Sequence, residues 1–245
     1  MTKIELINIG LNHSDGISLL QGVSVDMTGC RLIAILADTE DTAHSLLRVI
    51  AGFLSPDTGD VMFSGKNFYS DNEEDRSAIM RRNSYVFYAG GLISNLSVLE
   101  NIMLPLDFRR HLLSYEEKME KVEKLVSYFK LAPEIINKRP SQLSRTELKL
   151  INFVRGYAIE PEAIMIESPY SRLNKNYEML IENIILESAF KKDIVHLFSQ
   201  DFESDLIYKA DMILAINEKK VSIFSKSAES FDEFNFTEFF ENKRV

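Results

Sequence analysis

The stretch Leu32-Ile33-Ala34-Ile35-Leu36 and the segment after it decide the fold of this chain. A short run of consecutive apolar residues, entered through the turn signal Thr28-Gly29, is typical of a fully buried parallel strand. The residues from Thr42 to Ala51 predict a helix, with Asp41 as its N-cap and Gly52 as its C-terminal stop. A buried strand followed directly by a helix indicates an α/β protein.

Working outward, strands and helices alternate along most of the chain. The expected strands are residues 4–11, 17–27, 32–36, 60–68, 163–166, 193–198 and 212–216. The first two are separated by the turn signal His13-Ser14-Asp15-Gly16 and predict antiparallel pairing. A helix is expected from Tyr177 to Ala189, and residues 76–157 are mainly helical in pattern. This order predicts a parallel sheet with a helical block inserted in the middle.

The clearest helix spans residues 115–129, where apolar residues recur every three or four positions on one face. Ser114 and Glu117 form its capping box. The face is expected to be core and consists of Tyr115, Met119, Val122, Val126 and Phe129.

Composition excludes several classes of protein. The 245 residues include 28 Lys plus Arg and 37 Asp plus Glu, a net charge of −9, which argues against nucleic-acid binding. Cys30 is the single cysteine, so an internal disulfide and a cysteine-cluster metal site are excluded, and it is expected to be a small buried hydrophobe. The chain shows no transmembrane-length apolar run and does not open like a signal peptide, so a cytoplasmic protein is expected.

Several motifs occur in a fixed order that resembles the nucleotide-binding domain of ABC transporters. The resemblance covers about residues 3–225 and rests on the region after the phosphate loop, the Q-loop region, the signature, Walker B with the D-loop, and the switch-histidine region. The matching stretches are LLRVIAGFLSPDTG (46–59), VFYAGGLISNLSVLEN (86–101), PSQLSRTE (140–147), EPEAIMIESP (160–169) with SRLN (171–174), and SQD (199–201) with AD (210–211).

The resemblance implies a specific architecture. It is an α/β fold with a RecA-like P-loop NTPase core and a parallel sheet, an N-terminal antiparallel β subdomain and an inserted α-helical subdomain at about residues 86–158. The nucleotide-binding-domain-like part would be residues 1–225, followed by a Phe-rich C-terminal tail at residues 226–245. Five phenylalanines between Phe231 and Phe240 are expected to pack on their own domain rather than dock on a partner subunit.

The Walker A pattern G-x-x-x-x-G-K-[ST] would fall at residues 37–44. It binds phosphates because glycines let backbone amides curl around them while a lysine and a hydroxyl reach the phosphates and magnesium. In this chain the two glycine positions hold Ala37 and Thr42, the lysine position Ala43 and the hydroxyl position His44, with Ser45 beyond.

Acidic residues in the same stretch oppose phosphate binding. Asp38, Glu40 and Asp41 stand where phosphates would lie, and Asp41 is expected to occupy the anion site as the helix cap. Each such charge would cost roughly 1–4 kcal/mol near the phosphates of ATP. His44 is expected on the helix surface; the alternative is a cation or a metal ligand.

The remaining catalytic positions also differ from the pattern that the resemblance implies. Walker B needs an Asp for magnesium and a Glu that orients the attacking water. Here Glu167 follows the strand and Ser168 stands at the position of the catalytic Glu. The other replacements are Tyr88 for the Q-loop glutamine, Gln200 for the switch histidine, Asn174 for the D-loop aspartate, and His13 for the aromatic residue that stacks on adenine.

The signature is replaced as well. Leu-Ser-Gly-Gly-Gln becomes Leu143-Ser144-Arg145-Thr146-Glu147, and Ser144 with Glu147 predicts a capping box for a helix at 145–157. The alternative is a retained phosphate contact, with Arg145 attracting the γ-phosphate. Because ABC sites are composite, such a chain would impair both sites of any dimer that it joins.

The surface that receives a permease's coupling helix in the family is better preserved. Its matching residues are Gly91, Leu92, Asn95 and Leu96. Docking of a permease and ordinary loop packing are equally good interpretations of these residues.

The resulting hypothesis is a degenerate ABC ATPase subunit, a pseudo-ATPase that supports an ABC permease at the inner face of the cytoplasmic membrane. Leu104-Pro105-Leu106 and the segment 210–221 resemble ATPases of MCE/Mla-type lipid transporters. No cofactor is predicted. The chain is expected to form either a homodimer or a heterodimer with another ABC ATPase subunit. One alternative is a divergent ATPase that uses ATP and Mg²⁺ through Glu167, Ser45 and Arg145; another is a regulator without a permease.

Overall fold

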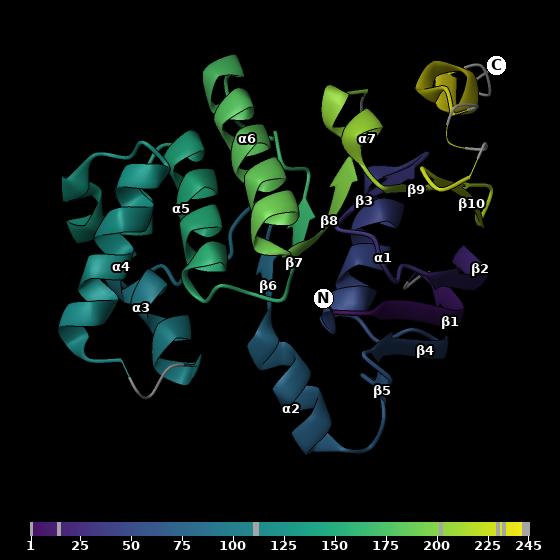
Figure 1. The fold of residues 1–245 in the computed structure, drawn as a ribbon, viewed down its shortest axis with the longest axis horizontal. Helices are drawn as coiled ribbons and strands as arrows, with labels where there is room; N and C mark the ends of the chain where they lie inside the picture. Colours follow the sequence, from purple (N-terminus) through teal and green to yellow (C-terminus); the bar gives the residue numbers. More distant parts are fainter. Residues whose placement is uncertain are drawn as a thin grey trace.

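The computed structural model describes residues 2–13, 16–109, 113–200, 203–228, 231 and 234–241. Two sheets lie side by side, and a group of helices extends from one of them (Figure 1). Within the described residues, no helix has the length and apolar character needed to cross a bilayer. Ser14 and Asp15 of the expected turn, Asp201 of the expected switch region and the final residues 242–245 lie outside the described part.

The larger sheet has the order β10-β9-β3-β8-β7-β6 and is parallel except for the β9–β10 pair. Every residue of β3 is buried, so the expectation of a covered central strand is confirmed. The bounds are β3 Leu32–Ala37, β6 Asn83–Val86, β7 Ala163–Glu167, β8 Val195–Gln200, β9 Met212–Asn217 and β10 Lys220–Ser225.

The smaller sheet is antiparallel and has the order β2-β1-β4-β5. Buried residues alternate with more exposed ones along β1 and β2, except at a bulge in the middle of the pair, as in sheets with one face on a core. The bounds are β1 Ile4–Asn12, β2 Ser18–Asp26, β4 Thr58–Phe63 and β5 Lys66–Asn67. The predicted α/β fold with an antiparallel N-terminal part is therefore confirmed.

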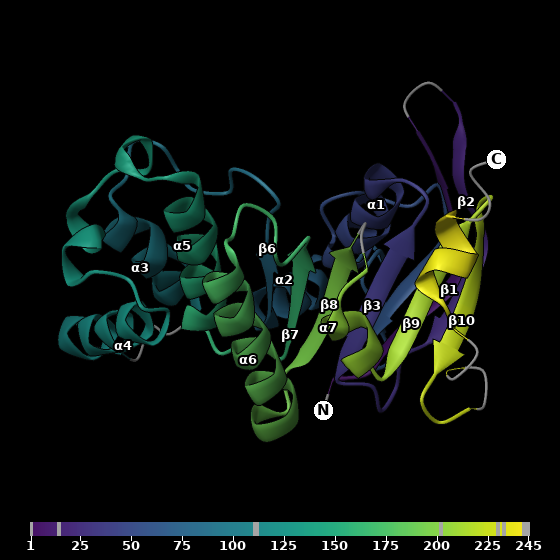
Figure 2. The same cartoon turned by 90° about the horizontal axis from the view of Figure 1, so that it is seen from above.

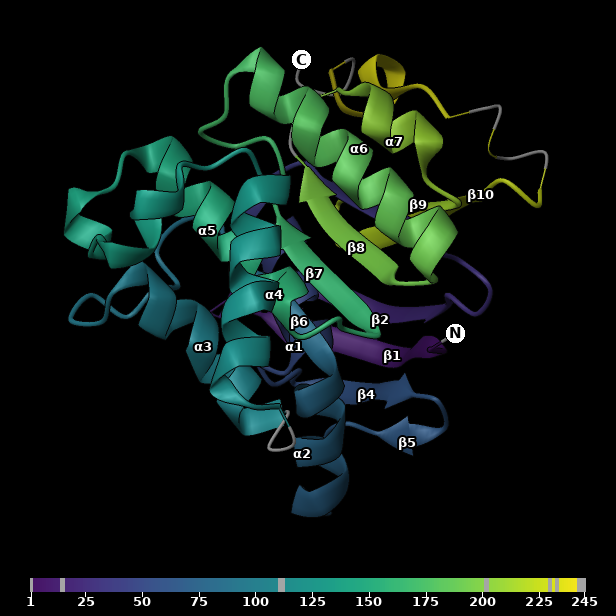
Figure 3. The same ribbon diagram turned by 60° about the vertical axis from the view of Figure 1, so that its left-hand side comes forward.

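The helices α3, α4 and α5 form a lobe beside the larger sheet, and all of them lie between β6 and β7 in sequence (Figures 2 and 3). This is the place where the sequence predicted an inserted helical block. The helix bounds are α1 Glu40–Ala51, α2 Glu73–Arg82, α3 Val98–Arg109, α4 Tyr115–Tyr128, α5 Arg145–Ala158, α6 Lys175–Lys192 and α7 Asp205–Lys209. Short helical turns span Pro133–Asn137, Pro140–Gln142 and Thr237–Glu241.

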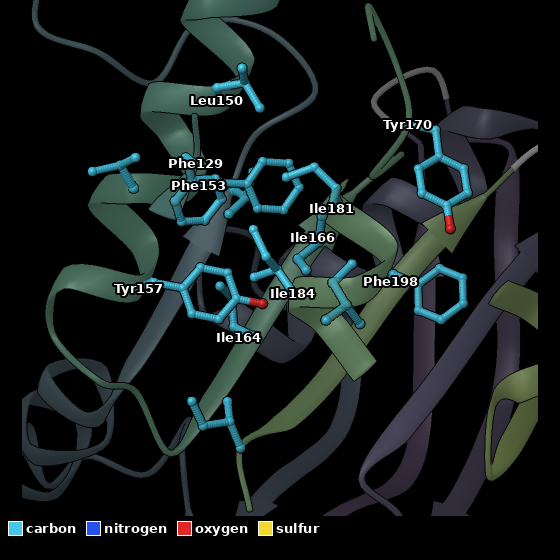
Figure 4. Close-up of a cluster of buried hydrophobic side chains, with 14 of the residues drawn as sticks. Phe129, Leu150, Phe153, Tyr157, Ile164, Ile166, Tyr170, Ile181, Ile184 and Phe198 are labelled. Carbon is cyan, nitrogen blue, oxygen red and sulfur yellow. The ribbon is translucent and has the colours of Figure 1, made fainter. Parts of the chain in front are cut away.

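Alternate residues of β3 divide the core into two clusters. Ile33 and Ile35 pack with α1 and the antiparallel sheet, whereas Ala34 and Leu36 pack with α5, α6 and α7. Figure 4 shows part of the second cluster, where aromatic side chains from α5 meet isoleucines from β7 and α6. The parallel sheet thus fixes the carboxyl ends of β3, β7 and β8 at one edge, next to α1.

Some local predictions were wrong. Thr39, not Asp41, caps α1, because the Thr39 hydroxyl accepts the Thr42 N–H at 3.3 Å. The strands β6 and β10 and the helix α7 were not predicted. β6 and α7 span only four and five residues, too few for a clear period, and β10 is an edge strand without a fully buried residue. Tyr115 is 63 % exposed, although the rest of its predicted face packs inward. The capping box of Ser114 and Glu117 and the burial of Cys30 are confirmed.

The described part of the Phe-rich tail packs on its own domain, as expected. Phe234, Phe236 and Phe240 are buried, and the Phe234 ring lies 5.0 Å from that of Phe224 on β10. The tail therefore continues the core over β10 and α7.

Candidate functional site

The Walker A stretch is mostly helical in this structure. Only Asp38 and Thr39 separate the end of β3 from the start of α1 at Glu40. The Ala43 N–H already donates to the Thr39 carbonyl at 3.4 Å, as in the body of a helix. Asp41, expected as the cap, lies exposed in the first turn instead. The backbone amides that a phosphate loop would present are thus partly used within α1.

His44 is buried at the base of this turn, so its expected place on the helix surface is wrong. Its ring nitrogen Nε2 lies 3.1 Å from the Ser168 hydroxyl, and the same hydroxyl donates to Glu40 at 3.2 Å. Burial lowers the pKa of His44, although Glu167 and Glu40 oppose the shift. These contacts arise because α1 turns this face toward the end of β7. A neutral imidazole at this point supplies no cation for a phosphate.

Glu167 is 1 % exposed and its carboxylate accepts three hydrogen bonds from the chain itself. One oxygen accepts from Arg48 Nε at 2.6 Å and from the Tyr85 hydroxyl at 2.7 Å, and the other accepts from the Tyr88 N–H at 2.6 Å. Burial raises the pKa of Glu167, but these three donors together hold it below the ordinary value. Across the described residues, no group of three or more His, Cys, Asp or Glu side chains is placed to hold a metal ion.

Lys149 on α5 is a second basic residue next to Glu167, and it is buried, whereas Arg48 is half-buried. Its ammonium donates to the Glu167 carbonyl at 2.7 Å and to the Phe87 carbonyl at 3.2 Å. Burial lowers the pKa of Lys149 to about 7, opposed by the Glu167 charge. Lys149 thus joins α5 to the end of β7 and to the segment just before Tyr88.

Tyr88, at the Q-loop glutamine position, has its ring next to two side chains, those of His44 and Arg172. Its ring centroid lies 5.8 Å from that of His44 and 5.2 Å from the Arg172 guanidinium carbon. The Arg172 carbonyl in turn accepts the Thr146 hydroxyl at 2.8 Å. This chain of contacts connects α1, the Q-loop segment, the D-loop and the start of α5.

The signature residues begin α5 as the sequence predicted. The Ser144 hydroxyl accepts the Glu147 N–H at 3.2 Å, and the Glu147 carboxylate accepts the Ser144 N–H at 2.7 Å. The capping-box interpretation is confirmed in the structure. Arg145 is exposed in the first turn of α5.

Gln200, at the switch-histidine position, ends β8 opposite Leu36 of β3. It is 2 % exposed, and neither atom of its amide has a hydrogen-bond partner within the described residues. The neighbouring Ser199 is bonded, because its hydroxyl accepts the Ser168 N–H at 3.2 Å. Gln200 is therefore a buried polar group at this edge that the described residues leave unsatisfied, as are the Ser171 and Ser204 hydroxyls.

The other expected pocket residues are placed less centrally. Ala37 ends β3 and Ser45 is half-buried on α1, one residue beyond His44. His13 lies at the end of the β1–β2 hairpin, where its N–H donates to the Ile17 carbonyl at 2.7 Å. The structure joins Tyr88 and Ser168 through His44. Ser144 and Arg145 directly precede Thr146, whose hydroxyl donates to the Arg172 carbonyl beside Tyr88.

The expected partner groove is held in a fixed loop. Asn101 is 1 % exposed and its side chain bonds to the backbone of Ile93 at both N–H and carbonyl. Gly91 has φ of +82°, and a Cβ at this position would lie 2.7 Å from the Asn152 side-chain oxygen. Leu92 packs on the core, whereas Asn95 is exposed beside Leu96.

Sequence reasoning missed Arg48, Tyr85 and Lys149. The signal for Arg48 is the spacing Glu40, His44 and Arg48, which repeats every four residues on one face of α1. Tyr85 and Lys149 give no such signal. Tyr85 bonds to the carboxylate of Glu167, which is distant in sequence, and Lys149 bonds to backbone carbonyls.

Comparison with known proteins agrees with this architecture. Among curated relatives, the sulfate/thiosulfate import ATP-binding protein CysA of Mesostigma viride is 25 % identical over 214 residues, covering 87 % of this chain and 59 % of that protein. The spermidine/putrescine import ATP-binding protein PotA of Thermotoga maritima is 28 % identical over 209 residues, covering 84 % and 54 %. The chain thus spans little more than half the length of these relatives.

Solved structures show the same fold. The dimeric bacterial ABC transporter cassette MJ0796 superimposes with a TM-score of 0.84 at 20 % identity, covering 91 % of this chain and 98 % of that one. A nucleotide-free ATP-binding cassette from an ABC transporter gives a TM-score of 0.72, also at 20 % identity, covering 95 % and 94 %. The sequence model of the ABC transporter family matches residues 44–171, which is more than half of the chain. This chain belongs to the ABC transporter family.

Proposed function

We propose that this chain is a pseudo-ATPase subunit of an ABC transporter, a degenerate cassette that supports or regulates a membrane permease without hydrolysing ATP. The observation that carries the proposal is the ion pair of Glu167 with Arg48, which uses the Walker B carboxylate inside the protein. A carboxylate that already accepts three hydrogen bonds has little capacity left for a magnesium ion.

The charges at the β3–α1 junction favour the same conclusion. Ala43 replaces the lysine that would reach the phosphates, and the nearby imidazole of His44 is buried with a lowered pKa. Asp41 remains exposed in the first turn of α1, where an anionic ligand would approach the helix end. The residues present therefore do not fit the triphosphate of ATP with its magnesium.

An exposed aromatic surface next to the expected groove supports a docking role. Phe53 is 52 % exposed, and its ring lies 5.4 Å from that of Phe87, which in turn lies close to Gly91. Met80 is 47 % exposed and lines the same hollow as Phe53. Exposed apolar residues grouped in this way are typical of a protein–protein contact. We assign this surface to a permease, which would place the chain at the inner face of the cytoplasmic membrane.

Fewer observations bear on the cargo and on the partner ATPase than on the nucleotide site. The relatives named above are import ATP-binding proteins for sulfate/thiosulfate and for spermidine/putrescine. Lipid cargo rests on Leu104-Pro105-Leu106 and on the segment 210–221 alone. Pairing with an intact ATPase in a heterodimer fits the proposal, because a homodimer would have no competent site.

Calorimetric titration with MgATP tests the nucleotide part of the proposal. We expect no heat of binding and no rise in melting temperature, whereas a ligand at about 100 times its Kd would add roughly 2.7 kcal/mol of stability. Micromolar binding of MgATP would contradict the conclusion that the site does not fit the nucleotide, and turnover of the bound MgATP would contradict the proposal as a whole.

The second candidate is a divergent ATPase, favoured by the unsatisfied amide of Gln200 and by the exposed Arg145. It predicts magnesium-dependent turnover that is lost in Glu167→Gln and in Arg145→Ala. Turnover that survives both substitutions would argue for a contaminating ATPase instead.

Docking is tested by purification of the tagged chain from detergent-solubilised membranes of its own organism. We expect an integral membrane protein with permease topology, identified by mass spectrometry, to be recovered with the wild type and lost with Phe53→Ser. The matched control is Met179→Ser on α6, where the side chain is 57 % exposed away from the expected groove. Recovery that is equal in both variants would remove Phe53 from the interface.

A further inference from the structure

A cleft lies between α4 and α6, and the C-terminal end of α5 forms part of its wall (Figure 2 shows the three helices). Its volume is about 330 Å³, within the range of small-molecule sites. Tyr157 in this wall is 13 residues after Ser144, so the cleft lies roughly 20 Å along α5 from the signature. We propose that this cleft binds an amphipathic carboxylate, with its apolar body inside and its acidic group at the rim.

The inner wall of the cleft is apolar. Leu125 from α4, Ile184 from α6 and Ile194 before β8 all line it, and they belong to or pack against the main core cluster. Figure 4 shows Tyr157 and Ile184 side by side at this end of the core. An apolar chain or ring that entered here would exchange water for side-chain carbon.

The polar groups at the inner end are already satisfied by one another. The Tyr157 hydroxyl and the Ser188 hydroxyl each lie 2.9 Å from His196 Nε2, and Ser188 also donates to the Ile184 carbonyl at 2.6 Å. Burial lowers the pKa of His196 to about 4, so the imidazole carries no charge at neutral pH. The acidic group of a ligand would therefore find no partner inside and would remain at the rim.

The rim of the cleft carries a cation that could pair with the acidic group of the ligand. Lys192, in the last turn of α6, lies with its ammonium 5.6 Å from the Tyr128 ring centroid, and it has no carboxylate partner within the described part of the chain. Lys124 pairs with Glu120, but both side chains are well exposed, so this pair is weak and easily exchanged. These two lysines flank Tyr128 and complement a single negative charge.

The remaining rim charges are committed elsewhere. Lys121 pairs with Glu160, and the Glu187 carboxylate accepts the Tyr128 hydroxyl at 2.8 Å. Neither carboxylate is free to occupy the position between Lys124 and Lys192. A ligand here would contact α4 of the inserted helices and α6 of the parallel core. It would therefore stabilise the packing of the inserted helices on the core.

Isothermal titration of the full chain with sodium decanoate tests the proposal, and the melting temperature is followed in parallel. We expect one saturable site and a rise in melting temperature. Lys192→Met, which keeps the apolar stem and removes the charge, is expected to weaken binding at least tenfold. Leu125→Phe, which fills the cleft, is expected to do the same.

The matched control is Lys175→Met at the other end of α6, where the lysine side chain is 84 % exposed. Its binding should equal that of the wild type. The proposal is overturned if decanoate does not bind at millimolar concentration, or if Lys192→Met and Lys175→Met bind alike. It is also overturned if the folded Leu125→Phe variant, verified by circular dichroism, binds as tightly as the wild type.

Discussion

Arg48 Nε donates to Glu167 Oε1 at 2.6 Å, and this contact ties the middle of α1 to the end of β7. The Glu167 side chain is 1 % exposed and that of Arg48 is 43 % exposed, so the carboxylate depends on its donors far more than the guanidinium does. In a working ABC site this edge of the sheet would face magnesium and phosphate. Here an internal cation already neutralises the carboxylate.

Removal of the Arg48 guanidinium should therefore destabilise the fold. Arg48→Met leaves the buried Glu167 carboxylate without its charged donor, and we expect a loss of about 1–3 kcal/mol, less than for a fully buried pair because Arg48 is partly exposed. The free energy of unfolding in urea measures the loss. Arg82→Met breaks the exposed pair with Glu162 and serves as the control, with an expected cost below about 1 kcal/mol. Equal losses in the two variants would count against the buried pair.

The stability of the protein at acid pH should depend on the same carboxylate, that of Glu167. Because the pKa of Glu167 lies below its ordinary value of 4.5, the unfolded chain binds the proton first as pH falls. The stabilisation is fully present above about pH 4.5 and is lost as pH decreases through the folded pKa. Glu167→Gln should lower stability at neutral pH and flatten the decline below pH 4.5. A variant with the same acid decline as the wild type would assign that decline to other carboxylates.

Lys149 should make the stability rise with pH again, in the alkaline range. Its pKa in the folded protein is about 7, whereas the unfolded value is near 10.5, so the unfolded chain holds more protons between these values. Stability should rise with pH from about 7 to about 10, because the neutral amine still donates to the Phe87 and Glu167 carbonyls. Lys149→Met should remove this rise; urea midpoints at pH 7, 8 and 9 measure it. Lys191→Met, on the last turn of α6, is the control.

Much of the fold follows from the sequence, because the strands at 32–36 and 163–166 are continuous apolar runs and the helix at 115–129 has one strong helical period. The contacts within the candidate site are harder to predict from the sequence. That His44 is buried depends on β7 lying next to α1, which is a tertiary contact between residues 124 apart in sequence. The burial of Glu167 behind Arg48 has the same origin. The residues at the Walker positions were visible in the sequence; the contacts of Arg48, Tyr85 and Lys149 with Glu167 were not.

The loop before α3 allows a paired test of backbone strain. Gly90 and Gly91 both have positive φ, +75° and +82°, but a Cβ on Gly90 meets nothing within 4 Å, whereas one on Gly91 would lie 2.7 Å from Phe87 and from Asn152. Gly90→Ala should cost roughly 1 kcal/mol from strain alone. Gly91→Ala should cost about 1–3 kcal/mol more, because the loop must shift. Chemical denaturation of the two variants measures the difference, and equal costs would mean that the loop yields freely.

A matched pair of capping boxes, on α5 and α4, separates a structural role of Ser144 from a nucleotide contact. Ser144 caps α5 and Ser114 caps α4 with the same bonds, each hydroxyl accepting the N–H of a Glu three residues later at 3.2 Å. Ser144→Ala and Ser114→Ala should each cost about 1 kcal/mol, measured by urea denaturation. If the signature position is only a cap, neither substitution changes the response to MgATP in calorimetry. A change confined to Ser144→Ala would show that the signature serine still contacts nucleotide, and the pseudo-ATPase proposal would then be wrong at this site.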